Sequence, residues 1–216
     1  MPESPMMTRI RRVRRGPAAP QVCFDRCMFL ATTPEANELL ERDPFARLIG
    51  MLLDQQIPME KAFTSPEVLR VRLGGRLDPV EIAQYEPEAF EAVFRQQPAL
   101  HRFPAAMAKR VQELARVIVE RFDGEPASVW TSAQSGHEVV ERVGALPGFG
   151  DQKAKIFAAL LGKQFGVRPQ GWREAAGDYG LEGSTRSVAD VTDAASLKAV
   201  RAYKQQMKAA AKAAKN

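Results

Sequence analysis

Apolar residues recur at helical spacing along most of the chain. One stripe begins at Phe45 and continues three, four and seven positions further on, so that its members share one face of a helix. A capping side chain followed by proline, a typical helix start, occurs at four places between residues 30 and 80. These pairs are Thr33-Pro34, Asp43-Pro44, Ser65-Pro66 and Asp78-Pro79. Gly74-Gly75 is expected to end the helix that begins at Ser65-Pro66.

The clearest helix lies in the middle of the chain, between Pro104 and Gly124. Its apolar stripe follows one helical face. The members are Met107, Val111, Leu114, Ile118 and Phe122. Shorter helices are predicted for residues 137–143 and 151–165. A last helix begins at Ala194 and has only a thin apolar side, so we expect it to pack at its start and fray at its end.

No segment alternates apolar and polar residues as a strand does, so the predicted fold class is all-α. Residues 1–23 are rich in arginine and lack periodicity, and we expect a disordered basic extension there. Residues 24–193 are predicted to form the helical domain, and residues 194–216 a basic helix or tail. Residues 166–191 are glycine-rich and irregular, and no element is assigned to them.

The positive charge is concentrated at the two ends of the chain. The whole chain carries +5 at a pI of about 9.4, whereas residues 1–23 carry +4 and residues 194–216 carry +6. The segment between them therefore carries −5. The ends either attract phosphates without regard to sequence or serve only to keep the protein in solution. Any nucleic-acid contact of the central segment must come from a local patch.

The chain has no apolar run near the roughly 18 residues that span a bilayer, and its N-terminus lacks the pattern of a signal peptide. We therefore expect a soluble, cytoplasmic protein, and a monomer. Cys23 and Cys27, the only cysteines, are spaced to share a helical face. Two ligands cannot complete a zinc or iron–sulfur site, which needs about four. We expect two reduced thiols, no metal and no cofactor.

A short segment with the sequence LPGFG, Leu146–Gly150, separates two predicted helices. Its glycines permit positive φ and a close approach of another backbone. The helix that follows presents unpaired N–H groups at its N-terminus, where its dipole also favours anions. Lys153 and Lys155 lie in about its first turn, where a positive charge is unfavourable unless a polyanion offsets it.

These features favour binding of a phosphate backbone at this segment, although an ordinary turn between two helices is the alternative. The residues expected to take part are Leu146, Gly148, Gly150, Gln152, Lys153 and Lys155.

The string LPGFGDQKA resembles the hairpin of the helix-hairpin-helix (HhH-GPD) superfamily of base-excision DNA repair glycosylases. Two other segments resemble the family in the same order: LLDQQIPMEKA at residues 52–62, and the long helix at 103–124. The resemblance covers about residues 40–166. It implies a multi-helix HhH-GPD glycosylase-like fold in which two small helical lobes flank a cleft. It also implies a nucleoid-associated protein whose partner is double-stranded DNA with a damaged or mispaired base.

The resemblance also assigns a role to Gln55 and Gln56. In the family, a glutamine or neighbouring side chain at this helix end enters the duplex where the target nucleotide leaves it. Unstacking a base costs a few kcal/mol, and such a wedge offsets part of that cost. Taken alone, the pair would be two surface amides.

The chain departs from the family at two positions. Family members place an aspartate just beyond the helix that follows the hairpin, where it stabilises positive charge developing on the sugar; that position is Gln170 here. Bifunctional members carry a Schiff-base lysine at the seventh hairpin position, which is Gln152 here. Lys153 lies about 100° further round the helix. The resemblance therefore argues against a lyase and leaves the glycosylase step open.

Asp178 is the candidate replacement carboxylate, with weaker alternatives in the same irregular segment and just beyond it. These alternatives are Glu174, Asp190 and Asp193. Trp172 and Tyr179 either stack on an extruded base or anchor the segment to the core. Members with an iron–sulfur cluster bind it through four cysteines downstream, and no cysteine follows Cys27, so no cluster is expected.

Three functions are consistent with the sequence. The first is a monofunctional DNA glycosylase, a hydrolase acting in base excision repair. The second is a non-catalytic protein that binds damaged or distorted DNA on the same scaffold. The third is an all-helical interaction protein whose hairpin is structural.

Overall fold

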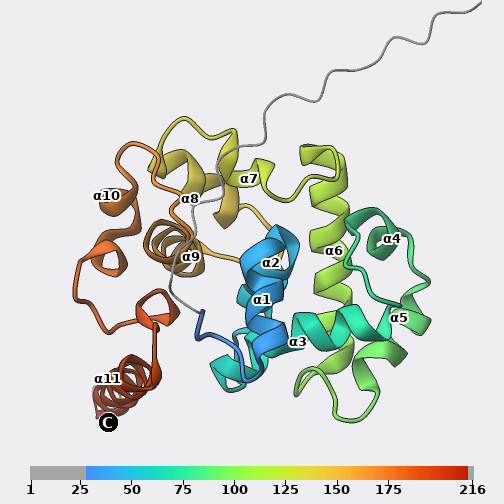
Figure 1. Ribbon diagram of the computed structural model, residues 1–216, viewed down its shortest axis with the longest axis horizontal. Coiled ribbons are helices and arrows are strands. Elements are labelled where there is room, and N and C mark those ends of the chain that lie inside the picture. The colour runs from blue at the N-terminus through green and yellow to red at the C-terminus, as the bar shows by residue number, and fades with distance from the viewer. Residues whose placement is uncertain (1–27, 214–216) are drawn as a thin grey trace, which may run out of the picture.

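The computed structural model describes residues 28–213, which form eleven α-helices and two short 3₁₀ helices (Figure 1). The predicted all-α class is confirmed. Within these residues the nearest approach to a strand is one isolated bridge between Ser135 and Gln170. No helix in the same range is long and apolar enough to cross a membrane. The basic extension expected over residues 1–23, with Cys23 and Cys27, lies outside the described residues.

Three of the four predicted helix starts are confirmed. The helices are α1 (Pro34–Arg42), α2 (Pro44–Leu53) and α4 (Pro79–Gln84). Each begins at the expected proline, and the side chain before it accepts hydrogen bonds from first-turn amides. For α2, the Asp43 carboxylate accepts from the amides of Phe45 and Ala46 at 2.8 and 3.1 Å. Glu86 caps α5 (Pro87–Arg95) in the same way.

The helix start predicted at Ser65-Pro66 is wrong, because α3 (Met59–Arg72) begins earlier and runs through Pro66. Proline removes one helical hydrogen bond, but this stretch is tied to a distant loop. The buried Ser65 hydroxyl donates to the Leu100 carbonyl at 3.0 Å as well as to that of Lys61 at 2.8 Å. The predicted end of the helix at Gly74-Gly75 is confirmed, with φ of 80° and 105°.

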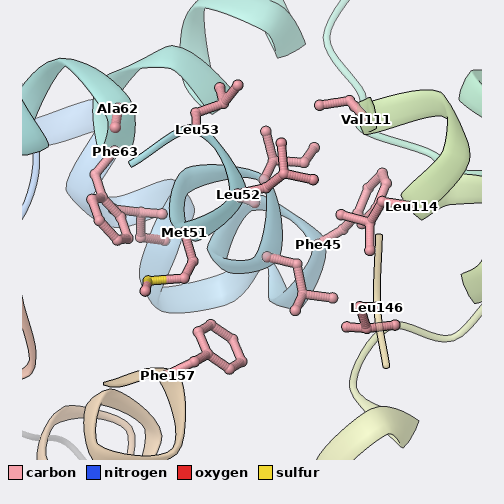
Figure 2. Packing of buried hydrophobic residues seen from close by; sticks show 14 of the residues in the cluster. Phe45, Met51, Leu52, Leu53, Ala62, Phe63, Val111, Leu114, Leu146 and Phe157 are labelled. Atoms are coloured by element: carbon pink, nitrogen blue, oxygen red, sulfur yellow. The ribbon is translucent and has the colours of Figure 1, made fainter. Parts of the chain in front are cut away.

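Helix α2 lies at the centre of the core and is buried on nearly all sides. Figure 2 shows its Phe45 and Leu52 pointing toward Leu114 of α6 (Pro104–Phe122) and its Met51 toward Phe157 of α9 (Asp151–Gln164). The predicted stripe of α6 is confirmed: four of its five members are buried, and Phe122 is partly buried. A helix that is apolar all round is typical of a fully enclosed position.

The remaining helices form two groups that α2 and α3 join (Figure 1). Helices α4 and α5 pack against α6. Four elements pack around α9, and α7 (Ser128–Thr131) packs on one of them. These four are α8 (Gly136–Gly144), α10 (Trp172–Ala176), η1 (Gly177–Gly180) and η2 (Val188–Asp190). The expected cleft between two lobes stays a prediction.

Trp172 holds the irregular segment that the sequence left unassigned. Its ring is buried against Gly162 of α9, so that a Cβ on this glycine would come within 2.3 Å of it. Its backbone lies equally close to Gly136 of α8. Of the two roles expected for Trp172, the structure favours the anchor, because packing at this density leaves little room for a stacked base.

The last helix, α11 (Ala194–Ala213), packs at its start as predicted, through the buried Val200 and the partly buried Leu197. Further along, its side chains reach the junction of α2 and α3. Arg201 pairs with Glu60, and the Lys204 ammonium lies 3.9 Å from the Asp54 carboxylate. Helix α11 therefore brings two positive charges to the junction of α2 and α3.

We predict that Gly162→Ala lowers the free energy of unfolding by about 1–3 kcal/mol, because the new methyl group must displace the Trp172 ring. Gly144→Ala is the matched control, since a Cβ there meets its nearest neighbour at 3.6 Å, and alanine favours a helix by up to about 1 kcal/mol. Urea unfolding of both variants checks this. Equal stabilities would contradict the role given to Trp172.

Candidate nucleic-acid interface

The hairpin Leu146–Gly150 is anchored to the core by its apolar residues. Leu146 is buried, and the Phe149 ring makes an edge contact with Phe157 of α9 at 6.1 Å between centroids. Gly148 has a φ of 78°, and a Cβ there would lie 3.3 Å from the Leu52 side chain. The protein's own packing therefore explains the glycine at position 148.

Gly150 is different, because nothing inside the described structure requires a glycine there. Its φ of −166° is extended backbone that any residue adopts, and no atom lies within 4 Å of a Cβ built on it. The open space lies at the start of α9. A small residue at this position leaves room for a molecule outside the protein to approach the backbone closely.

The N-terminus of α9 has no side-chain cap, in contrast to the starts of α1, α2 and α4. Its first amide groups therefore have no partner from a capping side chain, and the helix dipole favours an anion beside them. Asp151 in the first turn pairs with Lys155 at 2.8 Å, and both side chains are exposed to solvent. Lys155 therefore lies at the start of α9, as expected, and the Asp151 carboxylate partly balances its positive charge.

Lys153 turns back toward the protein instead of extending outward. Its ammonium donates to the carbonyls of Met51 and Leu52 at 3.0 and 2.8 Å, at the C-terminus of α2. A positive charge is favourable at a helix C-terminus, so α2 offsets the cost that Lys153 meets at the start of α9. Burial and, to a smaller extent, the Arg110 charge lower the pKa of Lys153 to about 8, against the effect of the Asp54 carboxylate.

The structure gives the two glutamines different surroundings. Gln55 is held in place: its amide nitrogen donates to the Leu52 carbonyl at 2.9 Å, and its amide oxygen accepts from Arg110 at 3.1 Å. Gln56 is exposed and has a φ of 58°, a left-handed conformation that is costly for a residue with a side chain. Gln56 is therefore the member of the pair that projects from the turn.

Two further residues, which the sequence analysis missed, lie beside this turn. The buried His101 hydrogen bonds to the Gln55 carbonyl through Nε2 at 2.9 Å and accepts the Phe103 amide through Nδ1 at 3.0 Å. Because Nδ1 accepts, the proton is on Nε2, and the imidazole is neutral. Phe103 itself is 43% exposed. The sequence shows an aromatic residue directly before Pro104. Only the structure shows that its ring is exposed and lies beside the glutamine turn.

Arg110 connects the turn to the hairpin. Besides its bond to Gln55, its Cδ lies 3.7 Å from the position of a Cβ on Gly148. The hairpin, the end of α2 and the start of α6 therefore meet at one place, which carries Arg110 and Lys153. These two residues form a local positive patch. A nucleic-acid contact of the central segment, whose net charge is negative, requires such a patch.

Position 152 faces a different element. The Gln152 amide donates to the Tyr179 hydroxyl of η1 at 2.9 Å, so Tyr179 lies close to the hairpin helix. Asp178, the adjacent residue, has a 68% exposed side chain and pairs with Arg186. Gln170 is exposed, and its carbonyl accepts from the Gly136 amide at 2.8 Å. The catalytic role suggested for Asp178 stays a prediction.

The weaker candidates have other surroundings. The Asp190 carboxylate is buried and bound by Lys163 at 2.5 Å and by the amides of Arg186 and Ser187, which identifies it as a structural group. Glu174 is exposed on α10. The Asp193 carboxylate accepts from Ser196 at the start of α11.

A carboxylate that the sequence analysis did not consider lies at the end of α2. The Asp54 side chain is only 14% exposed, and burial raises the pKa of its carboxyl above the ordinary value, against the effect of Lys204 and then Lys153. In the sequence, the only feature that pointed to Asp54 was its position directly before the glutamine pair. Within residues 28–213, no group of three or more potential ligands is arranged to hold a metal ion.

Comparison with known proteins agrees with this architecture. The family model for the HhH-GPD superfamily of base excision DNA repair proteins matches residues 49–216, more than half of the chain. The chain therefore belongs to the HhH-GPD superfamily, and it has a DNA-binding role in base excision repair. No curated protein matches the chain.

We predict that Gly150→Ala weakens DNA binding at least about tenfold, or roughly 1.4 kcal/mol, by filling the space in front of the α9 amides. Its stability should stay unchanged or rise by up to about 1 kcal/mol. Gly148→Ala is the contrasting variant, since a positive φ should cost about 1–2 kcal/mol of stability. Fluorescence anisotropy and urea unfolding measure both effects. Unchanged DNA affinity in Gly150→Ala would contradict the assignment of the hairpin.

We also predict that DNA affinity falls as the pH rises from 7 to 9. A lysine with a pKa of about 8 is charged below that pH and neutral above it, so the local patch loses a positive charge over this range. The loss should be up to about fivefold, the equivalent of roughly 1 kcal/mol for one nearby positive charge. In Lys153→Gln the same titration should be flat; an identical fall in both proteins would show that another group is responsible.

Proposed function

We propose that this protein is a monofunctional DNA glycosylase that hydrolyses the N-glycosidic bond of a damaged or mispaired base in double-stranded DNA. The observation that carries the proposal is the joint position of the hairpin and the glutamine turn. The open face of Gly150 and the uncapped amides of α9 meet one strand of the backbone, while Gln56 projects from the end of α2 beside them.

The proposed steps follow from these contacts. The α9 amides and the nearby positive charges bind phosphates flanking the target nucleotide. Gln56 enters the stack as the target leaves it, with the exposed Phe103 ring as an apolar neighbour. Gln55 and His101 hold the backbone of the turn. Position 152 supplies no amine, so the reaction ends at base release, without strand cleavage through a Schiff base.

No cofactor is part of the proposal. A four-cysteine cluster cannot form from a chain that contains two cysteines, and hydrolytic base excision needs only water, a carboxylate and a means of stabilising the sugar cation. The protein is proposed to act as a monomer.

A specific observation favours a second candidate, a non-catalytic protein that binds damaged or distorted DNA. The two positions where the family places its lysine and its aspartate are both glutamine here, Gln152 and Gln170. Such a protein retains the hairpin and the wedge and lacks the chemistry.

Two measurements test these functions in turn. Binding to a duplex with a tetrahydrofuran abasic analogue, titrated against salt, should give a steep negative slope of log affinity. A flat response would indicate that the hairpin does not contact phosphates.

Incubation with duplexes that each contain one damaged base, followed by hot alkali, then detects base release as strand breaks. Breaks with any lesion support the glycosylase, and binding without breaks for every lesion supports the second candidate.

We predict that Gln56→Ala lowers the preference for the abasic duplex over the intact duplex by about tenfold, or roughly 1.4 kcal/mol, without changing stability, because its side chain is exposed. Gln55→Ala should instead lower the free energy of unfolding by about 1 kcal/mol, since it removes part-buried hydrogen bonds. Competition binding and urea unfolding separate the two effects. The opposite assignment of effects would show that Gln55 is the wedge.

A further inference from the structure

The Asp54 carboxylate is unusual among the buried acids of the described residues because it accepts no hydrogen bond. Its nearest positive group, the Lys204 ammonium, is 3.9 Å away, beyond the 2.7–2.9 Å of a charge-assisted hydrogen bond. Glu60 has an equally buried side chain but contacts Arg201 closely, and Asp190 has three donors. A buried carboxylate without hydrogen-bond donors lowers the stability of the folded protein. Its presence at this position is therefore not explained by stability.

The carboxylate oxygens of Asp54 also remain open to solvent. Every fully buried side-chain oxygen or nitrogen in the described residues has a hydrogen-bond partner. Because the Asp54 oxygens have none, they must keep some contact with water. The group therefore lies in a mostly enclosed position with an opening to the outside, where a charge acts more strongly than it does in bulk water.

Asp54 is also placed at the junction of the proposed interface. It follows α2 directly and precedes the glutamine pair, and Lys153 of the hairpin helix lies close enough to lower its pKa. Asp178 lacks these features, since its side chain is mostly exposed and is paired with Arg186. Of the acids considered, Asp54 is the one that combines enclosure, free oxygens and contact with the wedge turn.

We propose that Asp54 is the catalytic carboxylate of this protein, facing the sugar of the extruded nucleotide and stabilising its positive charge; this inference rests on the proposed glycosylase function. The N-glycosidic bond breaks with its electron pair going to the base, which takes a proton from solvent. A water oxygen then bonds to the anomeric carbon, and one proton of that water passes to Asp54 and on to solvent. Binding of Lys204 to a DNA phosphate leaves the carboxylate free for this role.

The test compares two duplexes that differ in one charge. One contains a pyrrolidine abasic analogue, which is cationic and mimics the sugar in the transition state, and the other contains the neutral tetrahydrofuran analogue. Because a transition-state mimic binds at least about 100-fold more tightly than substrate in favourable cases, we expect the wild type to prefer the cationic duplex by at least about tenfold. Asp54→Asn should reduce that preference to within about twofold, while affinity for the tetrahydrofuran duplex stays unchanged or rises.

Asp178→Asn is the matched control and should keep the full preference. Lys204→Gln removes the neighbouring ammonium but not the carboxylate, and should keep or increase it. An equal loss of affinity for both duplexes in Asp54→Asn would mark a structural role and overturn the proposal, as would a wild type without preference for the cation. Failure of the proposed function itself is measured separately, in the alkali assay: no lesion would then give strand breaks, whatever the preference between the two analogues.

Discussion

The side chain of Lys153 donates to two carbonyls at the end of α2, and the rest of the interface depends on this contact. It joins the first turn of α9 to the last turn of α2 and thereby links the hairpin to the glutamine turn. A cation that is unfavourable at the start of one helix is favourable at the end of another. One residue therefore offsets the dipole cost, satisfies two terminal carbonyls and brings the amides that we propose bind phosphate next to the proposed wedge.

The sequence predicted those features that depend on neighbouring residues. Caps and prolines act within one turn, which is why the starts of α1, α2 and α4 were correct to the residue. The hairpin was recognisable for the same reason, since positive φ at Gly148 is a local property. The helix start at Ser65-Pro66 failed because a distant contact decided it: the Ser65 hydroxyl binds a carbonyl 35 residues away.

The parts of the site that the sequence could not predict are the non-local ones. Lys153 was expected to face a phosphate, but its ammonium is bound to α2, more than 100 residues earlier in the chain. Residues 166–191 show no apolar periodicity in the sequence. They are held instead by a non-local contact, the packing of Trp172 against Gly136 and Gly162. Asp54 was not considered from the sequence, because its neighbour Lys204 belongs to α11, which is distant in the sequence.

A carboxylate within a phosphate-binding surface weakens the binding of DNA, because it repels the same charges that Arg110 and Lys153 attract. Such a group contributes only where positive charge develops, and in base excision that happens at the sugar in the transition state. A protein that merely held DNA would bind it more tightly with an amide at position 54. In the proposed mechanism, the charge of Asp54 is thus a cost in the bound ground state that is offset only during bond cleavage. This asymmetry distinguishes the catalytic from the binding interpretation of the same scaffold.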